Sequence, residues 1–164
     1  MLTLDVTLRG DWDDVERVRS SVWNCVTAAL GPFDVRDAFA MVVAELLENA
    51  VKHGSSNDCG PPRLRLSIDP LRGVVTVRNV VVSDRCAERV LRSLEWLRGF
   101  PTSEEAYMAR LLALAECPDE GGSGLGLARV AYEGGCTLSA DYDGGVLSVT
   151  AVMDLGPSPA TARG

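Results

Sequence analysis

Four polar side chains that could together hold a metal and a polyphosphate lie within one short stretch of predicted helix. At the 100° per residue of an α-helix they fall within an arc of about 100°: Glu45, Asn49, Lys52 and His53. The alternative is a solvated helix face carrying a Glu48–Lys52 ion pair. Lys52 is the only lysine in a chain with fifteen arginines, and His53 is the only histidine. Because each is the only residue of its type, we interpret this polar stripe of the helix as a functional site and not as a solvated face.

A glycine-rich turn downstream, Gly122-x-Gly124-Leu125-Gly126, opens a predicted short helix. Glycines let the backbone take positive φ and come close to a ligand. The first turn of a helix also presents unpaired N–H groups to an anion. The turn therefore predicts a phosphate cradle, although such turns also serve close packing alone. It is not a Walker loop, because no Lys-Ser/Thr follows, and it lacks the parallel strand and acidic ribose ligand of a Rossmann site.

Composition limits the classes of function. With 164 residues, 46% hydrophobic and 24% charged, the chain fits one soluble domain over residues 1–155 and a disordered tail over 156–164. A net charge of −7 argues against nucleic acid as partner, because nucleic-acid binding needs a basic footprint. The arginines are dispersed, which argues against a membrane surface. No leader and no apolar run of about 20 residues is present, so we expect a cytoplasmic protein.

The five cysteines are widely spaced, odd in number and never arranged as C-x-x-C. They are Cys25, Cys59, Cys86, Cys117 and Cys136. This pattern predicts neither a disulfide framework nor a zinc site. Most of these cysteines are therefore interpreted as small buried hydrophobic residues in a reducing compartment.

Hydrophobic periodicity predicts the elements that position the stripe and the turn. The predicted strands cover residues 2–8, 63–69, 74–82, 137–143 and 146–154. The predicted helices cover residues 15–30, 34–53, 86–97, 103–116 and a short segment ending at 133. The second long helix has an apolar face formed by Phe39, Val43, Leu46, Leu47, Ala50 and Val51. We expect a two-layer α/β sandwich, with a mixed, mostly antiparallel sheet and helices on one face.

The two motifs together, Glu45-x-x-x-Asn49 on a helix and Gly122-x-Gly124-Leu-Gly126-Leu, resemble the GHKL (Bergerat-fold) ATP-binding family. Gyrase and the histidine kinases share that fold. The small size resembles the anti-sigma-factor serine kinases of bacterial partner switching. The likeness is closest to the SiaB-type branch, which has an asparagine at the usual aspartate position, a two-helix insert and a GGxGLGL ending. It extends over roughly residues 35–153.

The resemblance implies a fold, cofactors and residue roles. Its cofactors are ATP and Mg²⁺. Asn49 matches the asparagine whose side-chain oxygen binds Mg²⁺, an ion that prefers oxygen ligands and keeps several waters. Glu45 matches the glutamate that acts as general base. The residues implied to bind the nucleotide are Asn49, Lys52, His53, Asn79, Gly122, Gly124, Leu125 and Gly126.

The strand after the main helix departs from the family pattern. Most members have D-x-G-x-G there, in which the aspartate accepts the adenine amino group. This chain has Asn79 at the aspartate position and no glycine nearby, and Asp84 is a poorer substitute. A neutral amide accepts a weaker hydrogen bond than a carboxylate. We therefore expect modest nucleotide affinity or relaxed base selectivity.

Residues 84–120 occupy the place of the family's ATP lid and are predicted to form a folded insert with a mobile joint near residues 118–122. The insert is either a lid and partner-docking surface or an extension of the core. Trp96, Phe100 and Tyr107 are candidate docking anchors, although aromatic residues at helical spacing also form cores.

Two functions follow from these observations. The first is a Mg²⁺/ATP-dependent serine/threonine protein kinase that phosphorylates a small STAS-like or SiaC-like regulator. The second is a non-catalytic GHKL-fold adaptor, similar to an anti-sigma factor, that sequesters a partner with degenerate nucleotide binding. A histidine-kinase catalytic domain is disfavoured, because no phosphoacceptor helix precedes the motif. The sequence decides neither the identity of the partner nor whether the chain forms a homodimer.

Overall fold

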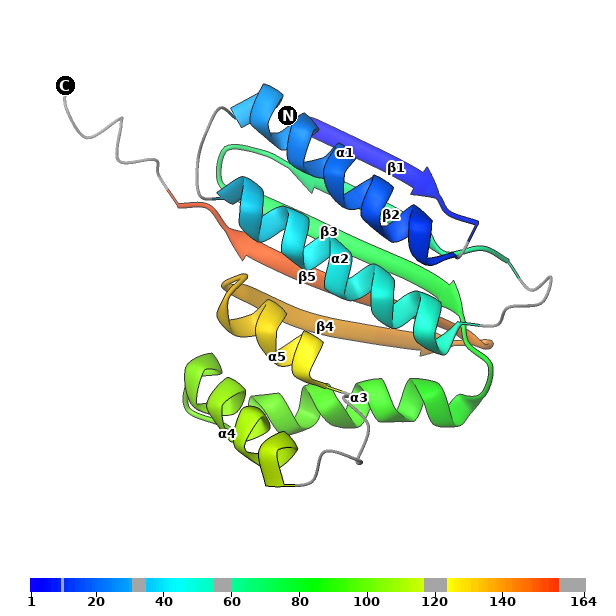
Figure 1. Ribbon diagram of the computed structural model, residues 1–164, viewed down its shortest axis with the longest axis vertical. Coiled ribbons are helices and arrows are strands. Elements are labelled where there is room, and N and C mark those ends of the chain that lie inside the picture. Colours follow the sequence, from blue (N-terminus) through cyan, green and yellow to red (C-terminus); the bar gives the residue numbers. More distant parts are fainter. Residues whose placement is uncertain (10, 31–34, 55–59, 117–123, 157–164) are drawn as a thin grey trace.

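A five-stranded sheet forms one layer of the molecule and helices cover one of its faces, as the computed structural model shows (Figure 1). The structure describes residues 1–9, 11–30, 35–54, 60–116 and 124–156. Its strands are β1 (Leu2–Thr7), β2 (Arg63–Ile68), β3 (Arg72–Val80), β4 (Cys136–Asp143) and β5 (Val146–Asp154). Its helices are α1 (Trp12–Leu30), α2 (Val35–His53), α3 (Asp84–Arg98), α4 (Ser103–Glu116) and α5 (Leu125–Tyr132). All the predicted elements are present, with small shifts at their ends.

The strands lie in the order β1-β2-β3-β5-β4, and each neighbouring pair is antiparallel. The predicted two-layer sandwich is confirmed. The sheet was predicted to be mixed and mostly antiparallel, but every pairing between these strands is antiparallel. The β4–β5 hairpin turns at Gly144 and Gly145, whose φ angles are +56° and +82°. Positive φ at both central residues matches the twist of a two-residue hairpin. Because β5 pairs with both β3 and β4, the chain leaves the sheet after β3 and returns to it at the edge strand β4.

The core lies between the sheet and the helices. Alternate residues of β2 and β3 are buried against the helical layer, and their neighbours face the opposite side, as a period of two requires. Phe39 of α2 is fully buried and its ring lies over Gly73 of β3. A Cβ at position 73 would overlap that ring. Gly73 is therefore needed for the close approach of α2 to the sheet.

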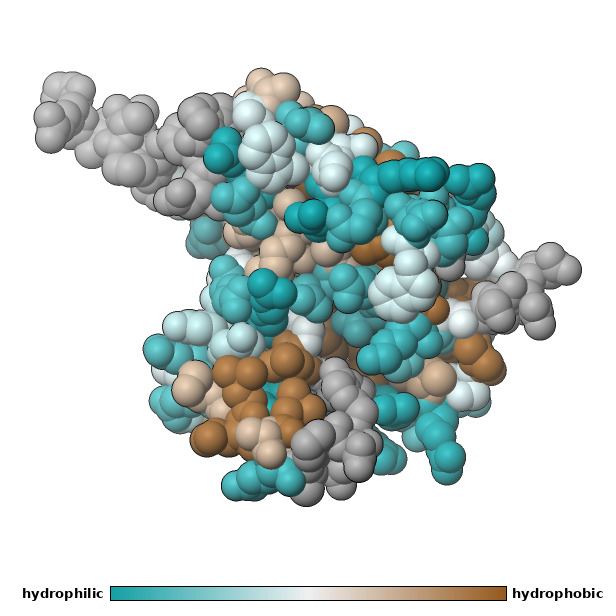
Figure 2. All heavy atoms as spheres, viewed as in Figure 1, coloured by the Kyte–Doolittle hydropathy of each residue, from teal (hydrophilic) through white to brown (hydrophobic). Residues whose placement is uncertain are grey.

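The predicted insert after β3 contains α3 and α4, which continue the structure beyond the β4 edge (Figure 1). Helix α3 buries Ala87, Val90 and Leu94, spaced along one face. Helix α4 differs, because Ala106 is its only buried residue. Met108 and Leu112 remain 50% and 62% exposed. Figure 2 shows the resulting apolar patch over α4, whereas the surface over α1 and α2 is mainly hydrophilic.

Several sequence predictions concern residues that the structure leaves undescribed. Gly122, the predicted joint near residues 118–122, and residues 157–164 of the predicted tail lie outside the described part. So do Cys59 and Cys117. The three described cysteines, Cys25, Cys86 and Cys136, have free thiols. No helix in the described part is both long and apolar enough to cross a membrane.

Candidate functional site

The polar stripe of α2 faces the N-terminal turn of α5, which lies beside α2 on the same face of the sheet (Figure 1). The approach is closest at Gly126. A Cβ built at position 126 would lie 2.5 Å from Glu45 Oε2 and 3.7 Å from Asn49 Nδ2. Only a residue without a side chain allows this contact. The structure therefore brings together two of the stripe residues, Glu45 and Asn49, and the glycine turn predicted to accompany them.

The described part of the turn has the geometry of an anion-binding helix start. Gly124 precedes α5 with φ +109°, a conformation that L side chains rarely adopt. Its carbonyl accepts the first helical hydrogen bond from the Ala128 N–H at 3.0 Å. The N–H groups of the first turn therefore have no partner within the helix. The guanidinium of Arg110, from α4, lies 3.1 Å from where a Cβ of Gly124 would stand, which adds a positive charge beside the turn.

Glu45 is held by an ion pair that sequence reasoning did not find. Its Oε1 accepts a hydrogen bond from Arg129 Nη1 at 3.0 Å. Arg129 Nε also donates to Glu133 Oε2 at 2.8 Å, and the Tyr107 hydroxyl donates to Glu133 Oε1 at 3.2 Å. The chain of contacts runs from α4 through the C-terminal end of α5 to α2. Its only sequence signal is the helical spacing that puts Gly126, Arg129 and Glu133 on one face of α5.

Burial is the main influence on the Glu45 carboxyl, whose side chain is 19% exposed. Desolvation raises the pKa of Glu45 above its ordinary value, and the hydrogen bond from Arg129 partly opposes that rise. A carboxylate with a raised pKa is a stronger base than a solvated one. Glu45 therefore has the environment of a proton acceptor.

Removing the guanidinium tests this account of Glu45. In Arg129→Ala, the pKa of Glu45 is expected to rise further, because burial remains while the hydrogen bond and the positive charge are lost. Carbon-13 NMR titration of the carboxyl group measures the change. Arg129→Lys keeps the positive charge, so the pKa of Glu45 in this variant should lie between its values in the parent and in Arg129→Ala. A Glu45 pKa that stays the same in both variants would show that Arg129 does not tune this carboxyl.

A small cavity lies farther along α2, beside Asn79, the residue predicted to accept the adenine amino group. Its polar lining residues are Asn49, His53 and Asn79, and the rest of its wall is apolar. The volume is about 10 Å³, hardly enough for one water molecule. Asn79 is 5% exposed and donates from Nδ2 to the Ala50 carbonyl at 3.3 Å. Its Oδ1 is thus the acceptor that the side chain offers to a ligand.

His53 and Lys52, at the C-terminal end of the stripe, differ in their surroundings. His53 lines the cavity beside Asn79, and burial, followed by the charges of Arg89 and Lys52, lowers its pKa. A neutral imidazole exchanges hydrogen bonds but adds no positive charge for a phosphate. Lys52 is exposed. Their predicted contacts with the nucleotide remain predictions.

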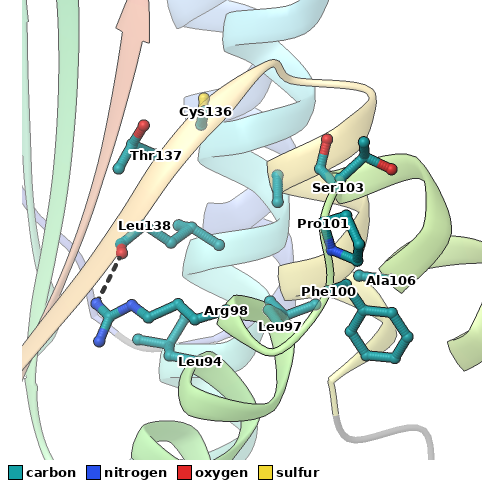
Figure 3. Close-up of a pocket in the computed structure, with 12 residues that line it drawn as sticks. Leu94, Leu97, Arg98, Phe100, Pro101, Ser103, Ala106, Cys136, Thr137 and Leu138 are labelled. Carbon is teal, nitrogen blue, oxygen red and sulfur yellow. Dashed lines mark hydrogen bonds between the residues drawn. The ribbon is translucent and has the colours of Figure 1, made fainter.

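A larger pocket of about 200 Å³ lies at the other side of α5, between α3, the start of α4 and β4 (Figure 3). Arg98 crosses it to donate to the Leu138 carbonyl at 3.2 Å. The Cys136 thiol is its one sulfur group, and burial raises the pKa of Cys136 to about 11. This thiol is protonated at neutral pH and unreactive. None of Glu45, Asn49 and Asn79 lines this pocket.

The side chains at this site suit Mg²⁺ better than a metal that is held by several protein ligands. The described residues contain no group of three or more His, Cys, Asp and Glu side chains that could hold an ion. Asn49 lies beside the glycine turn with Nδ2 nearest to position 126, and its side chain carries one amide oxygen that could bind an ion. Mg²⁺ is often held by one or two protein oxygens together with substrate phosphates and water. Asn49 would therefore suit an ion that arrives with a polyphosphate.

Comparison with known proteins links the chain to others through its fold. No protein-family description matches the sequence, and no curated protein matches it either. Among solved structures, a chain of the SiaB–SiaC complex from Pseudomonas aeruginosa superposes with a TM-score of 0.66. The match covers 93% of this chain and 89% of that chain, at 17% sequence identity. The two chains share the α/β sandwich, and at this identity the likeness is one of fold.

Proposed function

We propose that this chain is a Mg²⁺/ATP-dependent serine/threonine protein kinase of a bacterial partner-switching pathway, and that it phosphorylates a small STAS-like or SiaC-like regulator. The observation that carries the proposal is the contact of Glu45 and Asn49 with Gly126. Phosphoryl transfer asks mainly for positioning and charge neutralisation. This contact would set a carboxylate, a side-chain amide and a turn of backbone N–H groups around one position.

Each group has a distinct part in the proposed transfer. The backbone N–H groups from Gly124 onward and the Arg110 guanidinium would hold the phosphates, and Asn49 would hold the Mg²⁺ that supplies the neutralising charge. Glu45 accepts the proton of a serine or threonine hydroxyl. The hydroxyl oxygen forms a bond to the γ-phosphorus, the bond from that phosphorus to the β,γ-bridging oxygen breaks, and ADP leaves. The proton ends on Glu45.

The fold comparison supports a protein as the acceptor. The similar chain was crystallised in a complex named for two components, SiaB and SiaC. Because a chain with this fold assembles with a second protein in that complex, we expect the present chain to bind a protein as well. The net charge of −7 disfavours nucleic acid as that second component.

Binding a base requires a rearrangement at α3. A cavity of about 10 Å³ is too small for a purine, and Val90 of α3 forms part of its wall. The base can enter only when this part of α3 moves away from β3 and α2. Such opening is the expected behaviour of a lid, which in many enzymes controls access and product release.

A second candidate function rests on the same cavity. If α3 stays closed, the chain is a GHKL-fold adaptor that binds its partner without nucleotide. One observation favours this alternative: Val90 of α3 forms part of the wall of a cavity of only about 10 Å³. Nucleotide binding therefore separates the two functions.

Isothermal titration calorimetry with ATP, ADP and GTP provides this test. The kinase proposal expects ATP to bind more tightly with Mg²⁺ than without it. Val90→Ala should strengthen ATP binding by several-fold, because it widens the entrance to the cavity. Leu94→Ala, a truncation of similar kind on the same helix that does not line this cavity, should not. If none of the three nucleotides binds to either the parent chain or Val90→Ala, the adaptor is the correct function.

A further inference from the structure

The outer face of α4 is apolar and uncovered in the described structure. Met108, Leu112 and Ala115 follow one another at i, i+4 and i+7, which places them on one side of the helix. All three are exposed, Leu112 by 62%. The space-filling view shows this apolar patch at the surface (Figure 2). A contiguous apolar surface of this kind marks an interaction site more often than scattered single residues do.

Acidic residues bracket this face. Glu104 and Glu105 are exposed in the first turn of α4, and Glu116 is exposed at its last residue. Arg110 is the only basic residue of the helix, and it points inward, with its guanidinium 4.1 Å from the centroid of the Trp96 ring. Every charged group on the outer face is therefore negative. A complementary partner must bring positive charge to both ends of an apolar ridge.

The inner face of α4 contacts the candidate site at two points. Arg110 lies over Gly124 at the start of α5. Tyr107 donates to Glu133 beyond the end of α5, and its ring lies 5.4 Å from that of Tyr132. A partner bound to the outer face would therefore contact the helix whose inner face lies against the glycine turn. Through Glu133 and Arg129, the same helix is connected to Glu45. Of the predicted anchors, Tyr107 serves this inner contact.

We propose that the outer face of α4 is the docking surface for the protein partner, and that the partner presents an apolar ridge flanked by lysine or arginine. The inference rests on the proposed function for the identity of that partner as the phosphorylated protein. A second copy of the chain fits less well. Pairing α4 with its own copy sets glutamates against glutamates in either direction, and like charges facing each other across an interface are unfavourable.

A pair of synthetic helical peptides tests the surface without nucleotide or kinase activity. One carries leucine at i, i+3, i+4 and i+7 with lysine elsewhere, and the other has glutamate in place of lysine. Fluorescence anisotropy with the labelled peptides measures binding to the full chain. The basic peptide should bind, and Met108→Gln with Leu112→Gln should weaken it about tenfold or more. The matched control is Leu71→Gln, because Leu71 is also 62% exposed but lies far along the sequence in the β2–β3 turn.

Charge is tested separately from apolar contact. Glu104→Gln with Glu105→Gln should weaken binding of the basic peptide and reduce the salt dependence of that binding. Glu88→Gln with Glu95→Gln, on exposed positions of α3, should have a smaller effect.

Equal losses in the test and control variants, equal binding of the acidic peptide, or no binding of the basic peptide would overturn the proposal. So would self-association in sedimentation experiments that Met108→Gln with Leu112→Gln abolishes, because it would assign the surface to a second copy. A failure of ATP binding would leave this result unaffected.

Discussion

Glu45→Gln is expected to lower phosphoryl transfer by about 10²- to 10⁴-fold, the usual contribution of a positioned general base. Glutamine keeps the size of the side chain and an oxygen that can accept the hydrogen bond from Arg129 Nη1. It cannot take up a proton at neutral pH. ATP affinity should stay within a few-fold of the parent, so the loss should lie in the chemical step and not in binding.

Transfer of labelled γ-phosphate to a STAS-like or SiaC-like regulator from the same genome measures this effect, and slow ATP hydrolysis measures it without a partner. Glu48→Gln is the matched control, because Glu48 lies on the same helix, is also partly buried and is not bound to Arg129. Equal activity of Glu45→Gln and the parent would remove Glu45 from the mechanism. Control of the partner that persists unchanged in Glu45→Gln would favour the adaptor.

The pH dependence of transfer follows from the same carboxyl. Glu45 acts as a base only when it is ionised, so the rate should rise with pH as its proton is lost. Burial raises the pKa of Glu45 above 4.5, so the midpoint of this rise should also lie above 4.5. Glu45→Gln should remove that limb of the profile, whereas Glu48→Gln should keep it.

Gly126→Ala is expected to have the second largest effect, lowering transfer by about 10²-fold. The new Cβ would lie 2.5 Å from Glu45 Oε2, so the carboxylate must move away from the glycine turn. A displacement of about 1 Å in a catalytic group can reduce a rate by that factor. Alanine is otherwise favourable within a helix, so the loss should come from the contact and not from the helix itself.

A double-mutant cycle isolates this contact. Glu45→Asp shortens the side chain by one methylene and withdraws it from position 126. Gly126→Ala should therefore cost less stability in the Glu45→Asp background than in the parent, as urea denaturation would show. Gly99→Ala is the control, since Gly99 has φ −72° and its nearest neighbour is a backbone carbonyl oxygen. Additive costs in the cycle would indicate that Glu45 and Gly126 do not touch in solution.

The two largest predictions share a structural premise. Glu45 and Gly126 lie in different helices, and they meet because Phe39 and Gly73 let α2 lie close to the sheet while α5 packs beside it. The small cavity next to Asn79 depends on a third helix, since Val90 of α3 forms part of its wall. Under the proposed function, the part of the site that would take the adenine is therefore closed in this structure.

Local pattern was sufficient to predict most of the fold. Alternation in residues 63–68 and helical spacing in residues 35–53 depend on side chains a few positions apart, so both could be read without knowing the tertiary structure. The same holds for the Gly144-Gly145 hairpin, whose turn type follows from residue type. Glu45, Asn49 and Gly126 could be singled out because their residue types suit phosphate chemistry, and the structure confirms that these three converge.

Contacts between distant segments needed the tertiary structure. Arg129 lies 84 residues from Glu45 in the chain, and no local signal states which of fifteen arginines reaches this carboxylate. The outer face of α4 could not be recognised from the sequence either, because Met108, Leu112 and Ala115 have the same spacing as core residues. Only the absence of a covering element in the described structure leaves them exposed. The helices and strands and the residue types of the candidate site could be predicted from sequence alone, since they depend on neighbours along the chain. The pairing of side chains, the closing of the cavity and the uncovered face of α4 required the folded structure, since burial and pairing depend on neighbours in space.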